Sequence, residues 1–486
     1  MSLDRKKLFT DYIFNLIRMV LNIGLPVFVL PFVLNRIGPE NYGIFSYTNS
    51  IVSYFCMVAV LGIPEYAARL IARERKSPDL GKTIAEMLIL QTCSVTAAMI
   101  LYFTLFFPFF TSQYRDAYLI LSILIFSGYF NGEWFFVGTQ RFKFMSLRGM
   151  IFKILNVAAM IMTIRHGDDY MKYTLITALT SLGNSLITFL GILKYIHLRD
   201  FRNLKVRRHL KPVFVLFSLS VAGLINASID KTLTGYLVGP LYVGFYTLGF
   251  RLSRIILQLF TALNNIIFPR VTSYLAQNDD KQSSRLVSFN MNYILMLVLP
   301  IVLGMVLYSQ DIISILFDSE MLPAVTSLII LSFIIPFQAI KRLVRQQILL
   351  PRDKERVILY ITVAGILGNI ILNLILVPHY FHNGAAAATL CMEFMDVMIC
   401  LVYIRYKFGL IILTQDHIKY LLATPIVLIP YYFYGHGKEL SLIELFFVVV
   451  ISAFLYFMGL LLLHDPLFYK LVRKLRIRAR KDKSNT

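Results

Sequence analysis

Two arginines, Arg251 and Arg254, lie three residues apart inside a long apolar stretch. The same spacing is continued by four polar residues: Thr247, Gln258, Thr261 and Asn265. In a helix all six would share one face, because positions i, i+4 and i+7 recur on one side. Two guanidinium groups this close repel each other, so we expect an anion or carboxylates opposite them. Arginine matches phosphate oxygens bidentately, which favours a pyrophosphate or acidic-sugar ligand.

A second polar stripe lies near the start of the chain and consists of Asp11, Asn15, Arg18 and Asn22. Each Arg or Lys at bilayer depth costs about 2.5–3.5 kcal/mol, so such residues normally face water or a partner. We predict that the following residues bind substrate: Asn15, Arg18, Asn22, Lys231, Arg251, Arg254 and Gln258. The alternative is structural, with the arginines paired to carboxylates inside the membrane.

Four carboxylates lie in apolar stretches and are candidates for ion coupling: Glu133, Asp230, Glu393 and Asp396. Asp230 could couple transport to an ion or could pair with an arginine of the 242–268 helix. Glu393 and Asp396 are three residues apart, so they share a helix face. They could bind H⁺ or Na⁺, or they could neutralise an arginine. Both interpretations stay open for these acids.

The composition excludes a soluble globule. Of the 486 residues 57% are hydrophobic and 15% are charged, against roughly 25% charged in soluble proteins. Mean hydropathy is +0.68. We therefore predict an all-α, polytopic membrane protein. Segments of about 20 apolar residues predict fourteen spans: 12–34, 42–62, 84–107, 116–137, 149–164, 173–193, 213–234, 242–268, 289–308, 323–340, 357–377, 384–404, 418–434 and 441–463.

The basic residues behind the net charge of +21 are distributed unevenly between the loops on the two sides of the predicted spans. Of the 48 Lys and Arg residues, 38 fall in one set of alternating loops and tail, and five fall in the opposite set. By the positive-inside rule, both termini are cytoplasmic. We interpret the excess as an orientation signal in preference to a nucleic-acid site or a specific lipid site. Contacts of the basic loops with anionic lipid head groups stay open.

A repeated turn indicates an internal duplication. Gly38-Pro39 is followed by Gly43 and Phe45, and Gly239-Pro240 is followed at the same spacing by Gly244 and Tyr246. The copies are 201 residues apart, and each occupies the outer turn of a predicted helical hairpin. Chance is the alternative, because Gly-Pro is common in turns. The duplication predicts two six-helix lobes around a central cavity, plus two helices. The predicted boundaries are 1–200, 201–410, 411–463 and a basic tail at 464–486.

Several motifs together resemble the Wzx-type repeat-unit flippases, which form the polysaccharide-transport branch of the multidrug/oligosaccharidyl-lipid/polysaccharide exporter superfamily. They are the segment 38–45, Trp134-Phe135-Phe136-Val137-Gly138 before a basic loop, and Asp230-Lys231 ahead of Gly239-Pro240. Asn369 and Asn373, leading to Gly384-Ala385-Ala386-Ala387, complete the set. The resemblance covers nearly the whole chain.

This resemblance implies a flippase of the bacterial cytoplasmic membrane, not an enzyme. Its substrate would be an undecaprenyl-diphosphate-linked oligosaccharide for surface polysaccharide. It would use alternating access driven by an H⁺ or Na⁺ gradient, among membrane lipids and with polysaccharide-assembly proteins as possible partners. Arg18, Arg251 and Arg254 match the positions of cavity residues in the family. The resemblance does not reveal which sugar is carried.

Two other classes compete with this interpretation. A multidrug antiporter of the same superfamily usually places a carboxylate deep in the first lobe, where this chain has Arg18. A membrane polysaccharide polymerase or ligase usually needs a large outer loop with acids or His, and the outer loops here are short. The four cysteines lie in apolar stretches without metal-ligand spacing. No cofactor or metal is expected.

Overall fold

The computed structural model describes residues 2–110, 113–277, 279–412, 417–435, 437–465 and 468–469. Side chains are not described for residues 2–23 and for a few further positions, mainly within 219–224 and 259–266. The described residues form helices joined by turns and contain no strand. Among them, eight helical segments are long and apolar enough to cross a membrane. The prediction of an all-α polytopic membrane protein is confirmed, whereas the count of fourteen spans stays a prediction.

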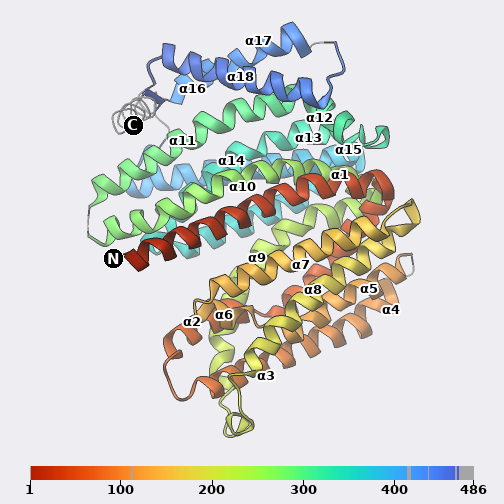
Figure 1. Ribbon diagram of the computed structural model, residues 1–486, viewed down its shortest axis with the longest axis vertical. Coiled ribbons are helices and arrows are strands. Elements are labelled where there is room, and N and C mark those ends of the chain that lie inside the picture. The colour runs from red at the N-terminus through yellow and green to blue at the C-terminus, as the bar shows by residue number, and fades with distance from the viewer. Residues whose placement is uncertain are drawn as a thin grey trace. The chain divides into compact units, whose positions relative to one another are not determined.

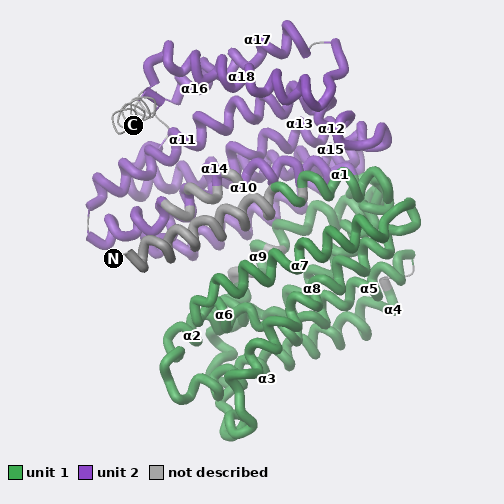
Figure 2. The backbone as a smooth tube through the Cα atoms, viewed as in Figure 1, with its two compact units in different colours: residues 1–244 green, residues 245–486 purple. Residues whose placement is uncertain are grey.

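The chain forms two compact units, residues 1–244 and 245–486 (Figure 2). The repeat predicts a lobe boundary at residue 200 instead, and the lobe boundaries stay a prediction. Unit 1 contains α1 (Ser2–Val60), α2 (Ile63–Glu74), α3 (Leu80–Leu101), η1 (Tyr102–Phe106), α4 (Phe107–Phe110), α5 (Arg115–Phe126), η2 (Ser127–Phe130), α6 (Glu133–Gly138), α7 (Phe142–Thr163), η3 (Gly167–Asp169), α8 (Tyr170–Leu193), η4 (Leu198–Phe201) and α9 (Arg207–Val238).

Helix α10 (Pro240–Ala276) begins in unit 1 and continues into unit 2. The rest of unit 2 contains α11 (Asp280–Leu307), α12 (Ser309–Leu316), η5 (Ser319–Met321), α13 (Ala324–Ser332), α14 (Ile334–Leu343), η6 (Val344–Leu349), η7 (Leu350–Arg352), α15 (Glu355–Phe408), α16 (Ile418–Ala423), η9 (Thr424–Val427), α17 (Leu428–Pro430), η10 (Tyr431–Gly435) and α18 (Leu442–Leu462). Within it, α14 packs against α11 and α15, and α18 packs against α11 (Figure 1).

Local sequence explains where several helices begin. The Asp279 carboxylate accepts a hydrogen bond of 3.0 Å from the backbone N–H of Gln282 at the start of α11. At the start of α18, Ser441 and Glu444 form a reciprocal capping box. Such caps satisfy N–H groups that have no partner within the helix. These signals lie within a few residues and are therefore visible in the sequence.

Both Gly-Pro turns have the same unusual backbone. Gly38 (φ 75°, ψ 169°) breaks α1 into two helices, and Gly239 (φ 100°, ψ 165°) separates α9 from α10. This region of backbone space is essentially restricted to glycine. The two turns also meet reciprocally. A Cβ atom on Gly43 would overlap the carbonyl of Pro240, and a Cβ atom on Gly244 would overlap that of Pro39. This paired close approach supports the predicted duplication.

The helix that contains the predicted span 323–340 extends beyond it. The helix runs from α13 through α14 and continues through the π-helical η6 to Arg352. Lys341, Arg342 and Arg345, which were expected in a loop, therefore lie in helix. The physical reason is that long basic side chains can lie along a helix when partners or water accept their charge.

Candidate functional site

The predicted polar face of α10 is accessible along part of its length. The side chains of Arg251, Arg254 and Gln258 are exposed, whereas Thr247 is buried. The guanidinium carbon of Arg254 lies 5.5 Å from the ring centroid of Phe250, one turn earlier. The side chains of the other predicted members of this face, Thr261 and Asn265, lie outside the described residues.

Arg342 on α14 extends this basic face and was missed at the sequence level. Its side chain is exposed, and its guanidinium interacts electrostatically with that of Arg254. Because both groups are positively charged, the interaction is repulsive. An anion placed between them would relieve this repulsion. The residue was missed because the predicted span ended at residue 340.

Glu393 and Asp396 on α15 are paired with cations inside unit 2. The Arg345 Nη2 atom donates to both carboxylate oxygens of Asp396, at 2.8 and 2.6 Å. Lys341 forms an ion pair with Glu393 and lies 3.6 Å from Asp396. Both acids are more than 90% buried. These contacts fit the interpretation that the two acids neutralise cations. The cations come from α14 and η6 and not from α10. Ion coupling by these acids stays a prediction.

Glu133 has a cationic partner in unit 1. It begins the short helix α6 after a break in the predicted span 116–137. An oxygen of its carboxylate lies 3.5 Å from Nη2 of the buried Arg148. Arg148 also donates to the carbonyl of Asn184 at 3.3 Å. The Glu133 side chain is half exposed, so the pair is screened. Its role in ion coupling stays a prediction.

Asp230 is buried on α9, next to the partly buried Lys231. One residue further, the Thr232 hydroxyl hydrogen-bonds to the hydroxyls of Ser50 at 2.9 Å and Tyr54 at 3.1 Å, both on α1. Asp230 also interacts electrostatically with Tyr54. This polar contact joins α1 to α9 within unit 1.

Two of the motif residues, Asn369 and Asn373, are buried on α15. Asn373 donates a hydrogen bond of 2.9 Å to the carbonyl of Asn369, and their side chains also pair. Thr389 hydrogen-bonds to the hydroxyl of Tyr246 at 3.2 Å. All four lie in unit 2. The two amides four residues apart in an apolar span are the local signal for the Asn369–Asn373 pair.

A further charged network was missed in unit 1. The fully buried Glu86 of α3 accepts a hydrogen bond from Arg208 at 2.6 Å and one from the backbone N–H of Lys205 at 2.7 Å. It also pairs with Nε2 of His209 at 2.8 Å, and Nδ1 of the same ring pairs with Tyr66. The network holds residues 205–209 against α2 and α3. Lys205, Arg208 and His209 lie about 120 residues from Glu86, so no local pattern in the sequence predicts the network.

The predicted stripe near the start of the chain lies on α1. Asn15, Arg18 and Asn22 belong to α1, but their side chains lie outside the described residues. Within the described part of the chain, no cluster of three or more His, Cys, Asp or Glu residues could hold a metal ion. The described residues of this site are exposed guanidinium groups on α10 and α14, with the exposed amide of Gln258 on the same face of α10.

Known proteins share both the sequence pattern and the fold. Residues 8–275 match the model of a family described as polysaccharide biosynthesis protein. A probable low-salt glycan biosynthesis flippase of Haloferax volcanii, Agl15, is 28% identical over 170 residues, covering 35% of this chain and 36% of that protein. A putative O-antigen transporter of Escherichia coli K12 is 22% identical over 262 residues, covering 53% and 63%. These matches thus span less than two thirds of the relatives' own length.

Two solved structures share the fold. The lipid II flippase MurJ, in an inward closed conformation, matches with a TM-score of 0.72 at 17% identity, over 95% of this chain and 99% of that one. An inward-facing MATE multidrug resistance transporter matches with a TM-score of 0.61 at 13% identity, over 81% and 94%. The family model covers more than half of the residues, and the chain therefore belongs to the polysaccharide biosynthesis protein family.

Proposed function

We propose that this protein is a flippase that moves lipid-linked oligosaccharide repeat units across the cytoplasmic membrane by alternating access. The observation that carries the proposal is the exposed basic face formed by Arg251, Arg254 and Arg342 in unit 2. Family membership and the names of two relatives, a glycan biosynthesis flippase and an O-antigen transporter, support a role in moving glycans. The fold shared with MurJ and with MATE transporters supports transport and not catalysis.

The charge of this face selects an anion. Each guanidinium at bilayer depth costs about 2.5–3.5 kcal/mol, and Arg254 and Arg342 also repel each other. A diphosphate offsets both costs, because its oxygens accept bidentate hydrogen bonds from arginine. We propose that the diphosphate of an undecaprenyl-linked sugar occupies this face. The amide of Gln258, one turn further along α10, is suited to sugar hydroxyls.

Further candidates for substrate binding lie in unit 1. Arg18, Asn15, Asn22 and Lys231 stay proposals for substrate binding. The coupling ion is proposed to be H⁺ or Na⁺. Substitution of Asp230 and Asp396 with Asn, and of Glu393 with Gln, tests which of these acids takes part in ion coupling. Cytoplasmic termini and association with polysaccharide-assembly proteins belong to the same proposal.

The test is a flipping assay with the purified full chain in liposomes. The substrate is a fluorescent polyprenyl-diphosphate-linked oligosaccharide, and a membrane-impermeant quencher reports its transfer between leaflets. Arg254→Gln is expected to lower the rate by about 10- to 100-fold, since a charge-assisted hydrogen bond contributes about 1.5–3 kcal/mol. Arg270→Gln is the matched control, because Arg270 is exposed on α10 about 160° around the helix from Arg254. Equal rates for Arg254→Gln and the control would refute the proposal.

A multidrug antiporter of the same superfamily remains the competing function, and the same liposomes discriminate between them. A site built for cationic drugs needs an accessible acid, whereas the exposed charges on α10 and α14 are positive. We expect the lipid-linked diphosphate to be transported and an organic cation such as ethidium not to be. Proton-driven ethidium uptake, abolished by Asp230→Asn, would favour the antiporter.

A further inference from the structure

An open pocket of about 450 Å³ lies in unit 1. Its volume is within the range of roughly 300–1,000 Å³ that small-molecule sites occupy. Five of its eight lining residues are aromatic: Phe126, Tyr129, Phe130, Phe189 and Phe201. The Tyr129 hydroxyl is already bonded to Thr96 at 2.8 Å. The lining therefore favours an apolar occupant.

The pocket extends from a surface segment into the helices. Phe201 belongs to η4, which contacts α3 near the start of that helix. Leu88 and Thr92 line the pocket from α3, eight and twelve residues after the helix begins at Leu80. At 1.5 Å per residue these positions lie about 12–18 Å along the helix axis. An extended hydrocarbon chain entering beside η4 would follow this path.

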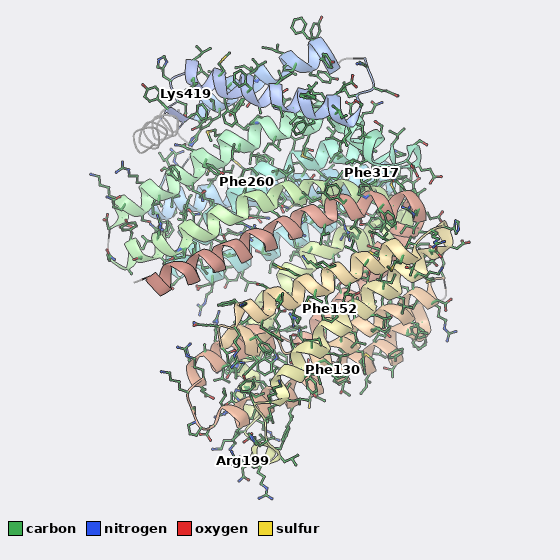
Figure 3. All side chains as sticks on the ribbon, viewed as in Figure 1. Phe130, Phe152, Arg199, Phe260, Phe317 and Lys419 are labelled. Carbon is green, nitrogen blue, oxygen red and sulfur yellow. The ribbon has the colours of Figure 1, made fainter. Side chains whose placement is uncertain are left out.

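The segment that carries Phe201 is strongly basic. Between residues 194 and 211 there are seven exposed Lys and Arg side chains and one acid: Lys194, Arg199, Arg202, Lys205, Arg207, Arg208, Lys211 and Asp200. Asp200 is occupied locally, because it accepts a hydrogen bond of 2.8 Å from the backbone of His197. Figure 3 shows Arg199 beyond the end of the helices of unit 1, whereas Phe130 lies among them.

The same segment presents apolar side chains to its surroundings. Leu198 is 92% exposed and Phe201 is 45% exposed. Basic residues interleaved with exposed apolar ones are typical of a chain that lies at a membrane surface, where cations attract anionic head groups. The backbone of the segment is fixed beside α3, since Lys205 and Arg208 both donate to Glu86. The head-group contacts and the pocket are therefore held at a constant separation.

We propose that unit 1 binds one anionic diacyl phospholipid at this place. One acyl chain occupies the aromatic pocket, and the phosphate lies against Arg199 and Arg202, on either side of Phe201. The charge of the segment selects an anionic lipid over a zwitterionic one. The apolar lining selects an intact lipid over a free phosphate. The inference is independent of the proposed substrate, because no residue of the basic face of unit 2 takes part.

The test measures lipid binding to the purified full chain by native mass spectrometry, with dioleoyl-phosphatidylglycerol and dioleoyl-phosphatidylcholine as probes. Thr92→Phe fills the pocket and is expected to weaken phosphatidylglycerol binding by about tenfold. Thr104→Phe is the matched control, because Thr104 is also exposed on a membrane helix of unit 1 but does not line the pocket. Phe201→Ser removes one wall at a side chain that is half exposed, and it provides a second variant that tests the pocket without changing the core.

The contribution of the basic side chains is tested with the double variant Arg199→Gln with Arg202→Gln. It is expected to weaken phosphatidylglycerol binding by about tenfold and to leave phosphatidylcholine binding unchanged. Arg356→Gln with Arg405→Gln, exposed in unit 2, controls for net charge. Equal binding of the two lipids by the wild-type chain would overturn the proposal, as would unchanged binding by both Thr92→Phe and Phe201→Ser. Displacement of the lipid by glycerol phosphate would indicate a free-phosphate site and would also overturn it.

Discussion

Three cations on one helical segment differ in their surroundings: two are paired with buried acids, and the third is exposed near another arginine. Lys341 and Arg345 lie four residues apart and contact buried acids of α15, with their side chains 15% and 18% exposed. Arg342, about 100° around the helix from Lys341, is exposed and faces another arginine, Arg254. Position along the helix alone therefore does not assign a role to an intramembrane cation. The partner and the exposure do.

The largest expected effect comes from breaking the buried ion-paired group. Asp396→Asn leaves Arg345 without its carboxylate in a region shielded from water. Removing one partner of a buried ion pair costs about 3–5 kcal/mol, because an uncompensated charge remains. We therefore expect a large fall in the free energy of unfolding, measured by denaturant titration in detergent micelles.

A double variant separates charge from packing at this site. Arg345→Met with Asp396→Leu removes both charges and should recover most of the stability lost in Asp396→Asn. If Asp396→Asn unfolds at the same denaturant concentration as wild type, Asp396 is not held as a buried ion-pair partner. The distinction between the two groups would then disappear.

A smaller loss of stability is expected at Glu86 in unit 1. Glu86→Gln keeps the shape of the side chain and one acceptor oxygen, but it loses the negative charge that Arg208 and His209 contact. Hydrogen bonds to charged groups contribute about 1.5–3 kcal/mol. We expect a decrease of this size in the free energy of unfolding. Glu65→Gln, on the exposed surface of α2, is the control and should be neutral.

At the exposed basic face the effect should be on transport and not on stability. Arg342→Gln removes one guanidinium from the proposed diphosphate site and also removes its repulsion of Arg254. We expect about a tenfold lower flipping rate, with the free energy of unfolding equal to or slightly above that of wild type. A large loss of stability without a specific transport defect would place Arg342 with Lys341 and Arg345 instead.

The smallest effect is expected at Glu133. Its pair with Arg148 spans 3.5 Å and its carboxylate is half exposed. Exposed pairs typically contribute about 0.2–1 kcal/mol. Glu133→Gln should thus change the free energy of unfolding by no more than about 1 kcal/mol. A loss comparable to that of Asp396→Asn would show that partial exposure does not weaken an ion pair in this protein.

The predicted helix breaks agree with the structure where a local sequence signal marks them. Gly38 and Gly239 have the turn conformations expected of Gly-Pro hairpins, and the predicted break before residue 384 is observed at Phe381 (φ 52°, ψ −132°). Prediction failed where a distant partner changes the outcome. The helix through Lys341 and Arg345 continues beyond residue 340, and acids 51 to 55 residues later in the chain neutralise its charge.

The sequence by itself determined the membrane class, the family motifs, the glycine turns and the shared helix face of Glu393 and Asp396. These depend on composition and on spacing of a few residues, which helical geometry converts directly into position. Only the tertiary structure decided which cations are paired, that Arg342 faces Arg254, and that Glu86 anchors residues 205–209. The physical reason is that burial and electrostatic pairing join helices far apart in the chain. No local pattern records which of them will meet.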